Sequence, residues 1–297
     1  MTRCGFIALI GAPNAGKSCL LNALAGHKIS IVSPKVQTTR TRITAIVTEG
    51  DRQAVFIDTP GIFRPRRRLD RAMVAAAHDA RDGADIVAIV ADAAKKDVAG
   101  TVNKLAGRLT RDAARRVILV LNKIDLVPRQ KLLPLIAQLN TLGFDAVFLV
   151  AATRDDGIAD LKRYLFDHLP EGPFQYDPDQ TSDQPDAILA AEITREKLFL
   201  RLHQELPYGL HVETVSFDEQ RDGSLRIEQR ILVSEPRHKG MVIGKEGTML
   251  GLVGQMARAE MEEIFSARVH LFLDVAVRTG WDEKSDVISG MGLDPRA

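Results

Sequence analysis

The chain has 297 residues, 45% hydrophobic and 27% charged, with a formal net charge of +1; these values exclude a disordered chain and suggest two globular domains. Two cysteines exclude a disulfide framework, and no apolar run approaches the roughly 20 residues of a membrane-spanning helix. Because the apolar run near the N-terminus is too short for a signal peptide, we expect a cytoplasmic protein.

A glycine-rich loop joins the first predicted strand, near residues 5–10, to a predicted helix. The loop reads Gly11, Ala12, Pro13, Asn14, Ala15, Gly16, Lys17 and Ser18. In this context the pattern is typical of a phosphate loop, where backbone N–H groups surround phosphates. Lys17 would reach the β and γ phosphates, and the Ser18 hydroxyl would bind Mg²⁺. The sequence therefore predicts a nucleoside triphosphate site.

A polar stretch at residues 37–40 precedes a predicted strand at 42–48 and resembles the first switch loop of GTPases. We expect Thr39 to join Mg²⁺ when the γ phosphate is present, with Thr38 as the alternative. Both threonines would also suit the start of a strand, so a purely structural role stays open.

The next strand, at 53–58, runs into a sequence that resembles the second metal-side motif of GTPases. A short turn separates it from the strand at 42–48, which predicts an antiparallel pair. The motif residues are Asp58, Thr59, Pro60 and Gly61. Asp58 would act on Mg²⁺ through a water, and the N–H of Gly61 would meet the γ phosphate, so Lys17, Thr39 and Gly61 are the catalytic candidates.

Ile62 stands where many GTPases have a glutamine that orients the attacking water. Its side chain cannot form a hydrogen bond, so we expect slow intrinsic hydrolysis. Asn14 resembles a phosphate-loop asparagine that holds K⁺ beside the phosphates in one branch of GTPases. An asparagine selected only for its turn geometry is an equal alternative.

Further strands are predicted at 85–91, 117–122 and 146–150. After the second of them, Asn122, Lys123 and Asp125 match the guanine-reading signature Asn-Lys-x-Asp. The Asp125 carboxylate accepts from two neighbouring N–H groups of guanine, whereas adenine presents an acceptor there. Alone, the tetrapeptide would also serve as a solvated helix cap. After the last strand, Ala152 lies in a stretch similar to the weak Ser-Ala-x motif that packs against the base.

A proline-rich polar stretch at 171–186 predicts a linker between two domains. Residues 1–170 would form an α/β nucleotide-binding domain with a doubly wound, mainly parallel sheet. Residues 187–297 would form a smaller α+β domain with a helix at 187–206, a hairpin of strands at 211–217 and 225–233, a second helix to about 265 and a strand at 270–277.

The second domain contains an Ile-Gly-x-x-Gly sequence before its second helix, which is the signature of a KH domain. Its two glycines would let the backbone approach a single-stranded nucleic acid closely. The alternative is a plain glycine-rich helix start. The RNA-binding candidates are Arg237, Lys239, Gly244, Lys245 and Gly247.

The charge distribution limits this prediction. From residue 186 onward there are 14 lysines and arginines against 19 aspartates and glutamates, a net −5, while residues 1–185 carry a net +6. Attraction to phosphate must therefore be local and rest largely on backbone N–H groups. We expect RNA affinity to depend only modestly on salt.

Together, these motifs resemble the Era family of GTPases over nearly the whole chain. The most specific segments are residues 58–63, 67–73 and 237–247. The resemblance implies a P-loop GTPase domain followed by a type II KH domain, with GTP or GDP and Mg²⁺ as cofactors. Whether K⁺ is an additional cofactor stays open. It also implies a monomer that binds the 3′ end of 16S rRNA during small ribosomal subunit assembly, with some peripheral association with the inner membrane.

Gly251 departs from this resemblance, which implies a basic residue in the helix after the KH loop. We expect a weaker helix start and weaker local RNA affinity there. Two other functions stay open at this point. One is a tRNA-modifying GTPase, although neither cysteine is placed for that chemistry, and the other is an RNA adaptor that does not hydrolyse GTP.

Overall fold

The computed structural model describes residues 1–33, 39–40, 42–61, 67–107, 115–202 and 206–296. The protein divides into two compact units, formed by most of the chain before residue 184 and by the chain from Gln184 onward. Each unit has its own sheet and its own hydrophobic core. Within the described residues, no helix has the length and apolar character required to cross a membrane.

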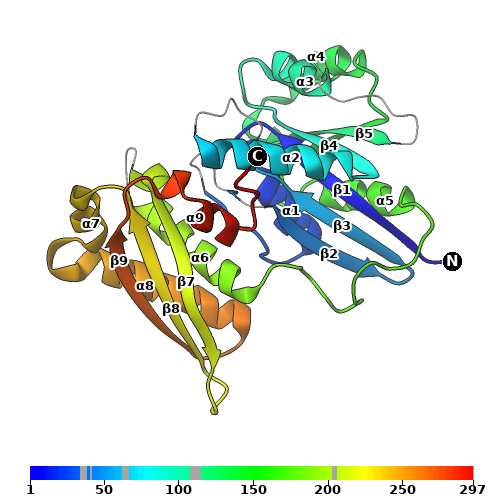
Figure 1. Cartoon of the computed structure of the whole chain (residues 1–297). Coiled ribbons are helices and arrows are strands. Elements are labelled where there is room, and N and C mark those ends of the chain that lie inside the picture. Colours follow the sequence, from blue (N-terminus) through cyan, green and yellow to red (C-terminus); the bar gives the residue numbers. More distant parts are fainter. Residues whose placement is uncertain (34–38, 41, 62–66, 108–114, 203–205, 297) are drawn as a thin grey trace. The chain divides into compact units, whose positions relative to one another are not determined.

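The first unit alternates strands and helices (Figure 1). In chain order its elements are β1 (Arg3–Gly11), α1 (Lys17–Ala25), β2 (Ile43–Glu49), β3 (Arg52–Asp58), α2 (Arg68–Asp82), β4 (Ile86–Asp92), α3 (Val98–Ala106), β5 (Arg116–Asn122), η1 (Ile124–Leu126), α4 (Arg129–Asn140), β6 (Ala146–Val150) and α5 (Ile158–Asp167). The strands form one sheet in the order β2-β3-β1-β4-β5-β6. Only the pair β2 and β3 is antiparallel, which confirms the predicted doubly wound, mainly parallel sheet.

Both faces of this sheet are covered because successive side chains of a strand point to opposite sides. Ile7 and Leu9 of β1 belong to the core that includes α1 and α5, whereas Ala8 and Ile10 belong to the core that includes α3 and α4. The parallel strands end at the same edge of the sheet. The loops that follow β1, β3, β5 and β6 therefore gather there, and they carry the predicted nucleotide motifs.

The proline-rich stretch predicted as a linker groups with the first unit as far as Asp183. The buried Gln53 side chain accepts N–H bonds from Gln175, at 2.9 Å, and Tyr176, at 3.1 Å. Further along, the N–H of Ile46 on β2 donates to Thr181 O at 2.8 Å. Because it bonds to β2 and β3, we name residues 171–183 the strap. Proline prevents regular structure in such a segment but leaves its other backbone groups able to bond.

The second unit has the element order α-β-β-α-α-β (Figure 1). Its elements are α6 (Asp186–Arg201), η2 (Leu206–Gly209), β7 (Leu210–Glu219), β8 (Leu225–Val233), α7 (Pro236–Ile243), η3 (Lys245–Gly247), α8 (Thr248–Phe265), β9 (Val269–Val277), η4 (Trp281–Glu283) and α9 (Ser285–Gly290). β7 and β8 are antiparallel and β8 and β9 parallel, in the order β7-β8-β9. This arrangement confirms the predicted type II KH domain.

The structure corrects the sequence analysis of this unit in two places. The short helix α7 before the glycine turn was not predicted, although Pro236 occupies a first-turn position that favours a helix start. Gly240 lowers the helix propensity of the same segment, which hides it from pattern analysis. The helix α6 ends at Arg201, earlier than residue 206.

Candidate functional site

The phosphate loop connects β1 to α1, and its glycines are required by close contacts. Gly16 has φ +92°, and a Cβ there would lie 2.2 Å from Nδ2 of Asn122. At Gly11 a Cβ would lie 2.3 Å from the carbonyl oxygen of Val90. No side chain caps the N-terminus of α1, so no cap competes for its first-turn N–H groups. The geometry of the predicted residues 11–18 at this helix N-terminus therefore suits an anion.

Lys17 is buried at the first position of α1 and points back over the loop. Its Nζ lies 3.3 Å from Gly11 O and 3.4 Å from Ala12 O. Burial lowers the pKa of Lys17, and the nearby Asp58 carboxylate opposes this shift. The ammonium group is therefore placed at the loop that would hold phosphates, as the motif predicts.

Three predicted metal ligands from different parts of the chain meet at one point. The Ser18 hydroxyl donates to Asp58 Oδ2 at 2.8 Å, and the Thr39 hydroxyl donates to the same oxygen at 3.0 Å. The two hydroxyl oxygens lie 2.9 Å apart. Of the two alternatives in the first switch, the structure places Thr39 in this cluster, and Thr38 lies outside the described residues.

The cluster fits a hard divalent cation. Asp58 is fully buried, and its second oxygen, Oδ1, has no hydrogen-bond partner within the described part of the chain. Burial raises the pKa of Asp58, opposed by Lys17 and by the hydroxyl hydrogen bonds. A carboxylate and two hydroxyls supply the oxygen donors that Mg²⁺ prefers. Within the described residues there is no group of three or more His, Cys, Asp or Glu side chains that would hold a metal ion instead.

The chain after Asp58 returns to the phosphate loop. The Thr59 hydroxyl donates to Leu9 O at 3.0 Å, and Pro60 is buried. A Cβ at Gly61 would lie 2.8 Å from the backbone nitrogen of Pro13, so only glycine fits at this approach. Gly61 is therefore adjacent to the loop, whereas Ile62 lies outside the described residues.

Asn122 at the end of β5 connects two of the predicted nucleotide segments. Its Nδ2 donates to Ala15 O at 3.1 Å. Its Oδ1 accepts from the N–H of Lys123 at 2.8 Å and from the N–H of Ala152 at 3.1 Å. With only 1% of its surface exposed, this side chain fixes the phosphate loop and the loop after β6 to each other.

Lys123 and Asp125 extend the same network. Lys123 adopts φ +64°, and its Nζ donates to Asn14 O and to Asp92 Oδ2, both at 2.7 Å. Asp125 lies in η1 with 13% of its side chain exposed. Its Oδ2 lies 3.3 Å from Nε of Arg154, a residue that the sequence analysis did not single out. Arg154 lies two positions after Ala152, in the loop predicted to pack against the base. This closeness in sequence was the available signal that Arg154 lies near the base site.

In the second unit, the predicted KH signature forms a tight turn between α7 and α8. Gly244, Glu246 and Gly247 all have positive φ, at 75°, 53° and 79°. A Cβ at Gly244 would lie 2.7 Å from Cβ of Met249. Glu246 is exposed, and α8 begins at Thr248 without a side-chain cap. The turn therefore presents an uncapped helix N-terminus beside backbone that side chains do not cover.

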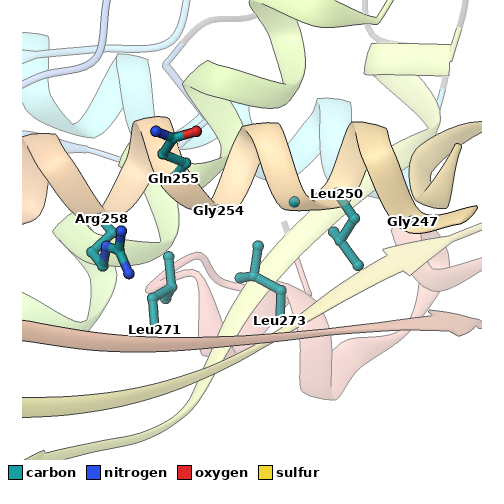
Figure 2. Close-up of a pocket in the computed structure, with 8 residues that line it drawn as sticks. Gly247, Leu250, Gly254, Gln255, Arg258, Leu271 and Leu273 are labelled. Atoms are coloured by element: carbon teal, nitrogen blue, oxygen red, sulfur yellow. The ribbon is translucent and has the colours of Figure 1, made fainter.

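A groove of about 510 Å³ lies beside this turn, between α8 and β9. Figure 2 shows Leu250 and Arg258 of α8 extending toward β9, with Leu271 and Leu273 of β9 facing α8. The groove is lined by Gly247, Leu250, Gly251, Gly254, Gln255, Arg258, Leu271 and Leu273. Three of these residues are glycines, so part of the α8 surface has no side chains. Despite Gly251, α8 continues without interruption to Phe265.

The predicted RNA-binding side chains surround the turn and do not line the groove. Arg237 and Lys239 are exposed on α7, and Arg237 forms an ion pair with Glu235 at 2.6 Å. Lys245 is exposed within the turn. The one cationic side chain that lines the groove is Arg258, which the sequence analysis missed because it lies eleven residues beyond Gly247 on an ordinary helix.

Comparisons with known protein families match both units. A family described as 50S ribosome-binding GTPase matches residues 6–123, and the KH domain family matches residues 205–282. A relative named GTPase Era from Bradyrhizobium sp. strain ORS 278 is 50% identical over 297 residues, covering 99% of this chain and 95% of the relative. The protein of the same name from Dinoroseobacter shibae is 50% identical over 298 residues, with 99% and 96% coverage.

Solved structures agree with these relatives. An Era variant from Aquifex aeolicus bound to GDP·AlF4⁻ has a TM-score of 0.92 and 31% identity, over 98% of this chain and 99% of that chain. A structure of Era in complex with MgGDPNP and nucleotides 1506–1542 of 16S ribosomal RNA matches with the same TM-score, identity and coverage.

Proposed function

The chain belongs to the Era family of GTPases, and from this premise we propose that it couples GTP hydrolysis to binding of the 3′ end of 16S rRNA in small ribosomal subunit assembly. It hydrolyses GTP to GDP and phosphate with Mg²⁺ as cofactor. The convergence of Ser18, Thr39 and Asp58 beside the phosphate loop is the observation that carries this proposal. Relatives over the full chain give no support to a tRNA-modifying enzyme or to an adaptor without hydrolysis.

We assign the nucleotide contacts as follows. The backbone N–H groups of residues 11–18 other than Pro13, together with the Lys17 ammonium, hold the phosphates, because they form an uncapped cradle with one buried cation. Asp125 pairs with guanine, and Ala152 packs against the base from the loop that Asn122 fixes. Thr59 and Pro60 hold Gly61 beside Pro13, from where its N–H would meet the γ phosphate.

Ser18, Thr39 and Asp58 would hold Mg²⁺, which when bound neutralises charge on the β and γ phosphates. During hydrolysis, Lys17 and the loop N–H groups stabilise the charge that develops on the transferred phosphoryl group. Ile62 cannot orient the attacking water, so intrinsic turnover is slow. Asn14 is the candidate to hold K⁺ at the same phosphates, from a loop position with φ +62°.

The nucleotide half of the proposal is tested by binding and turnover. We expect the protein to bind GDP at least about 10⁴-fold more tightly than ADP, since the base site is built on buried hydrogen-bonding groups. Asp58→Asn should remove the Mg²⁺ dependence of GTP binding, while Asp160→Asn on the exposed face of α5 should not. Hydrolysis measured in K⁺ and again in Na⁺ tests Asn14. Equal affinities for GDP and ADP would contradict the proposal.

The RNA half is supported by the glycine turn and the groove of the second unit. The α8 N-terminus offers N–H donors to RNA phosphates, and the glycine-lined wall of the groove lets bases approach the helix backbone. Lys245, Arg237 and Lys239 are exposed around the turn and add local positive charge. Because the chain from residue 186 is acidic overall, most of the contact is with the backbone and salt dependence is modest.

Binding of a single-stranded oligonucleotide with the 3′ rRNA sequence tests this half. We expect tighter binding with a GTP analogue than with GDP, since hydrolysis releases the switch segments. Gly254→Leu should fill the groove and abolish binding, whereas Gly290→Ala, in open space at the end of α9, should not change it. Equal affinities in the two nucleotide states would contradict the coupling.

The remaining expectations about the protein's setting are part of the proposal. It would be a cytoplasmic monomer with peripheral contact to the inner membrane, and this last point follows only from the family resemblance. Flotation with anionic vesicles tests the membrane contact, and sedimentation tests the monomer.

A further inference from the structure

Arg154 is the one ion-pair partner that the described residues provide for the Asp125 carboxylate. We infer that Arg154 is a specificity-determining residue of the base site, which positions Asp125 to select a base with two adjacent N–H donors. The inference rests on the proposed function, because it assumes that Asp125 reads guanine. Arg154 is a positioning residue, since it acts through Asp125.

The loop after β6 determines where Arg154 lies. The N–H of Arg154 donates to Ala151 O at 2.8 Å, and the N–H of Ala151 donates to Asp156 O at 3.0 Å, so residues 151–156 form a closed turn. Asp155 at its tip has φ +55°. The bond from Ala152 N–H to Asn122 Oδ1 fixes the base of this turn to the end of β5. Arg154 is thus held by backbone bonds at the edge of the base site.

The chemistry of a carboxylate explains why this contact affects selectivity. Each oxygen has two lone-pair sites, so Oδ2, which lies 3.3 Å from the positively charged Arg154 Nε, keeps a site for the base. A carboxylate held by one oxygen cannot rotate freely, and both oxygens then face the two donors of guanine at once. The neighbouring Ala151 and Ala152 side chains have no donor that would do this.

Burial of the carboxylate alone distinguishes this pair from an ordinary surface ion pair. The Asp125 side chain is 13% exposed and the Arg154 side chain 67%, whereas the ion-paired Asp160 and Arg163 side chains on α5 are 69% and 71% exposed. Exposed pairs contribute little, because water competes for both partners. The α5 pair is therefore a matched control of the same chemical type in the same unit.

The test compares GDP with IDP, whose hypoxanthine base lacks the 2-amino donor. Competition against a fluorescent GDP would give both dissociation constants for the wild type, Arg154→Gln and Arg163→Gln. In Arg154→Gln we expect the constant for GDP to rise about fivefold and that for IDP about twofold or less, because IDP has only one donor to lose. Arg163→Gln should leave both constants unchanged.

The outcomes separate this inference from the proposed function. A wild-type protein that does not bind GDP would contradict the proposed function itself. Equal increases for GDP and IDP, no change, or tighter binding by Arg154→Gln would each overturn the positioning role of Arg154. If Arg154→Gln does not fold, Arg154→Lys replaces it. Its ammonium keeps the charge but lacks the planar Nε donor, so the same fall in the GDP preference is expected, to a smaller extent.

Discussion

The phosphate loop and the glycine turn before α8 both place a helix N-terminus next to glycine, but different interactions support them. Around the phosphate loop, buried side chains bond to the backbone, as Asn122 does with Ala15 and Ala152. In the glycine turn, by contrast, the Thr248 hydroxyl donates an exposed hydrogen bond to Lys245 O at 2.8 Å. Backbone conformation and van der Waals contact hold the second site.

This difference follows from what each site would bind. A buried polar network is rigid and selective, because any unpaired group in it costs free energy. Such a network suits one nucleotide. An exposed turn with glycines offers backbone and space, which suits a flexible single strand. Substitutions should therefore act through unpaired polar groups in the first unit and through steric strain in the second.

The largest effect is expected at Asn122. Asn122→Ala leaves Ala15 O and the N–H groups of Lys123 and Ala152 without this partner, and we expect the free energy of unfolding to fall by about 3 kcal/mol. GDP binding should fall by at least about 100-fold, because both nucleotide loops lose their common support. Urea unfolding and GDP titration measure the two effects.

Asn140→Ala, at the exposed end of α4, is the matched control and should be neutral. If Asn122→Ala and the wild type had the same urea concentration at the midpoint of unfolding, the first unit would not depend on its buried network. The contrast between the two sites would then fail.

An intermediate effect is expected from two glycines of the same turn. Gly244→Ala adds a Cβ 2.7 Å from Met249 at φ +75°, so it combines a clash with backbone strain and should cost about 2 kcal/mol. Gly247→Ala has similar φ but open space, and should cost about 1 kcal/mol. Thermal unfolding would rank the two variants. Equal losses would mean that conformation alone, without packing, determines the turn.

The smallest effect concerns the ion pairs that join α6 to α8. Lys197 on α6 pairs with Glu196 at 2.8 Å and with Glu260 on α8. Burial lowers the pKa of Lys197, but the bonds to the two glutamates outweigh it, so the net shift is upward. A lysine whose pKa is higher in the folded protein than in the unfolded chain stabilises the fold. This contribution is fully present at a pH below the pKa of the unfolded chain, and it is lost as the pH rises through the pKa of the folded protein.

We therefore expect the stability advantage of the wild type over Lys197→Met to shrink as the pH rises above the ordinary pKa of lysine, about 10.5. Urea unfolding at several pH values measures it. The exposed Lys104 provides the control, since Lys104→Met should show no such trend. An advantage that is constant or grows with pH would exclude the ion pairs as a support of α8.

The sequence was sufficient to predict the contacts that depend on fixed motifs. The cluster of Ser18, Thr39 and Asp58 was predicted as a metal site because each residue follows a recognisable strand or loop. Arg154 and Arg258 were not predicted, since their positions depend on the direction of a turn and on a groove between α8 and β9. Such directions result from tertiary packing and leave no periodic pattern in the sequence.

The strap illustrates the same limit for the fold. Its prolines and polar residues predict a linker, and composition contains no information on partners elsewhere in the chain. Its partner is Gln53, a polar residue inside an apolar strand. A buried glutamine among hydrophobic residues was the available signal, since a buried amide requires bonding partners.

The strap also has a consequence for the behaviour of the protein at high concentration. β2 is the outermost strand of its sheet, and outer strands present unpaired N–H and C=O groups that recruit strands from other molecules. Ser182 forms a bridge to Ala45, and its hydroxyl donates to Thr44 O at 2.8 Å, so part of this outer row is already occupied. The proline-rich segment thereby protects the sheet against aggregation through its edge.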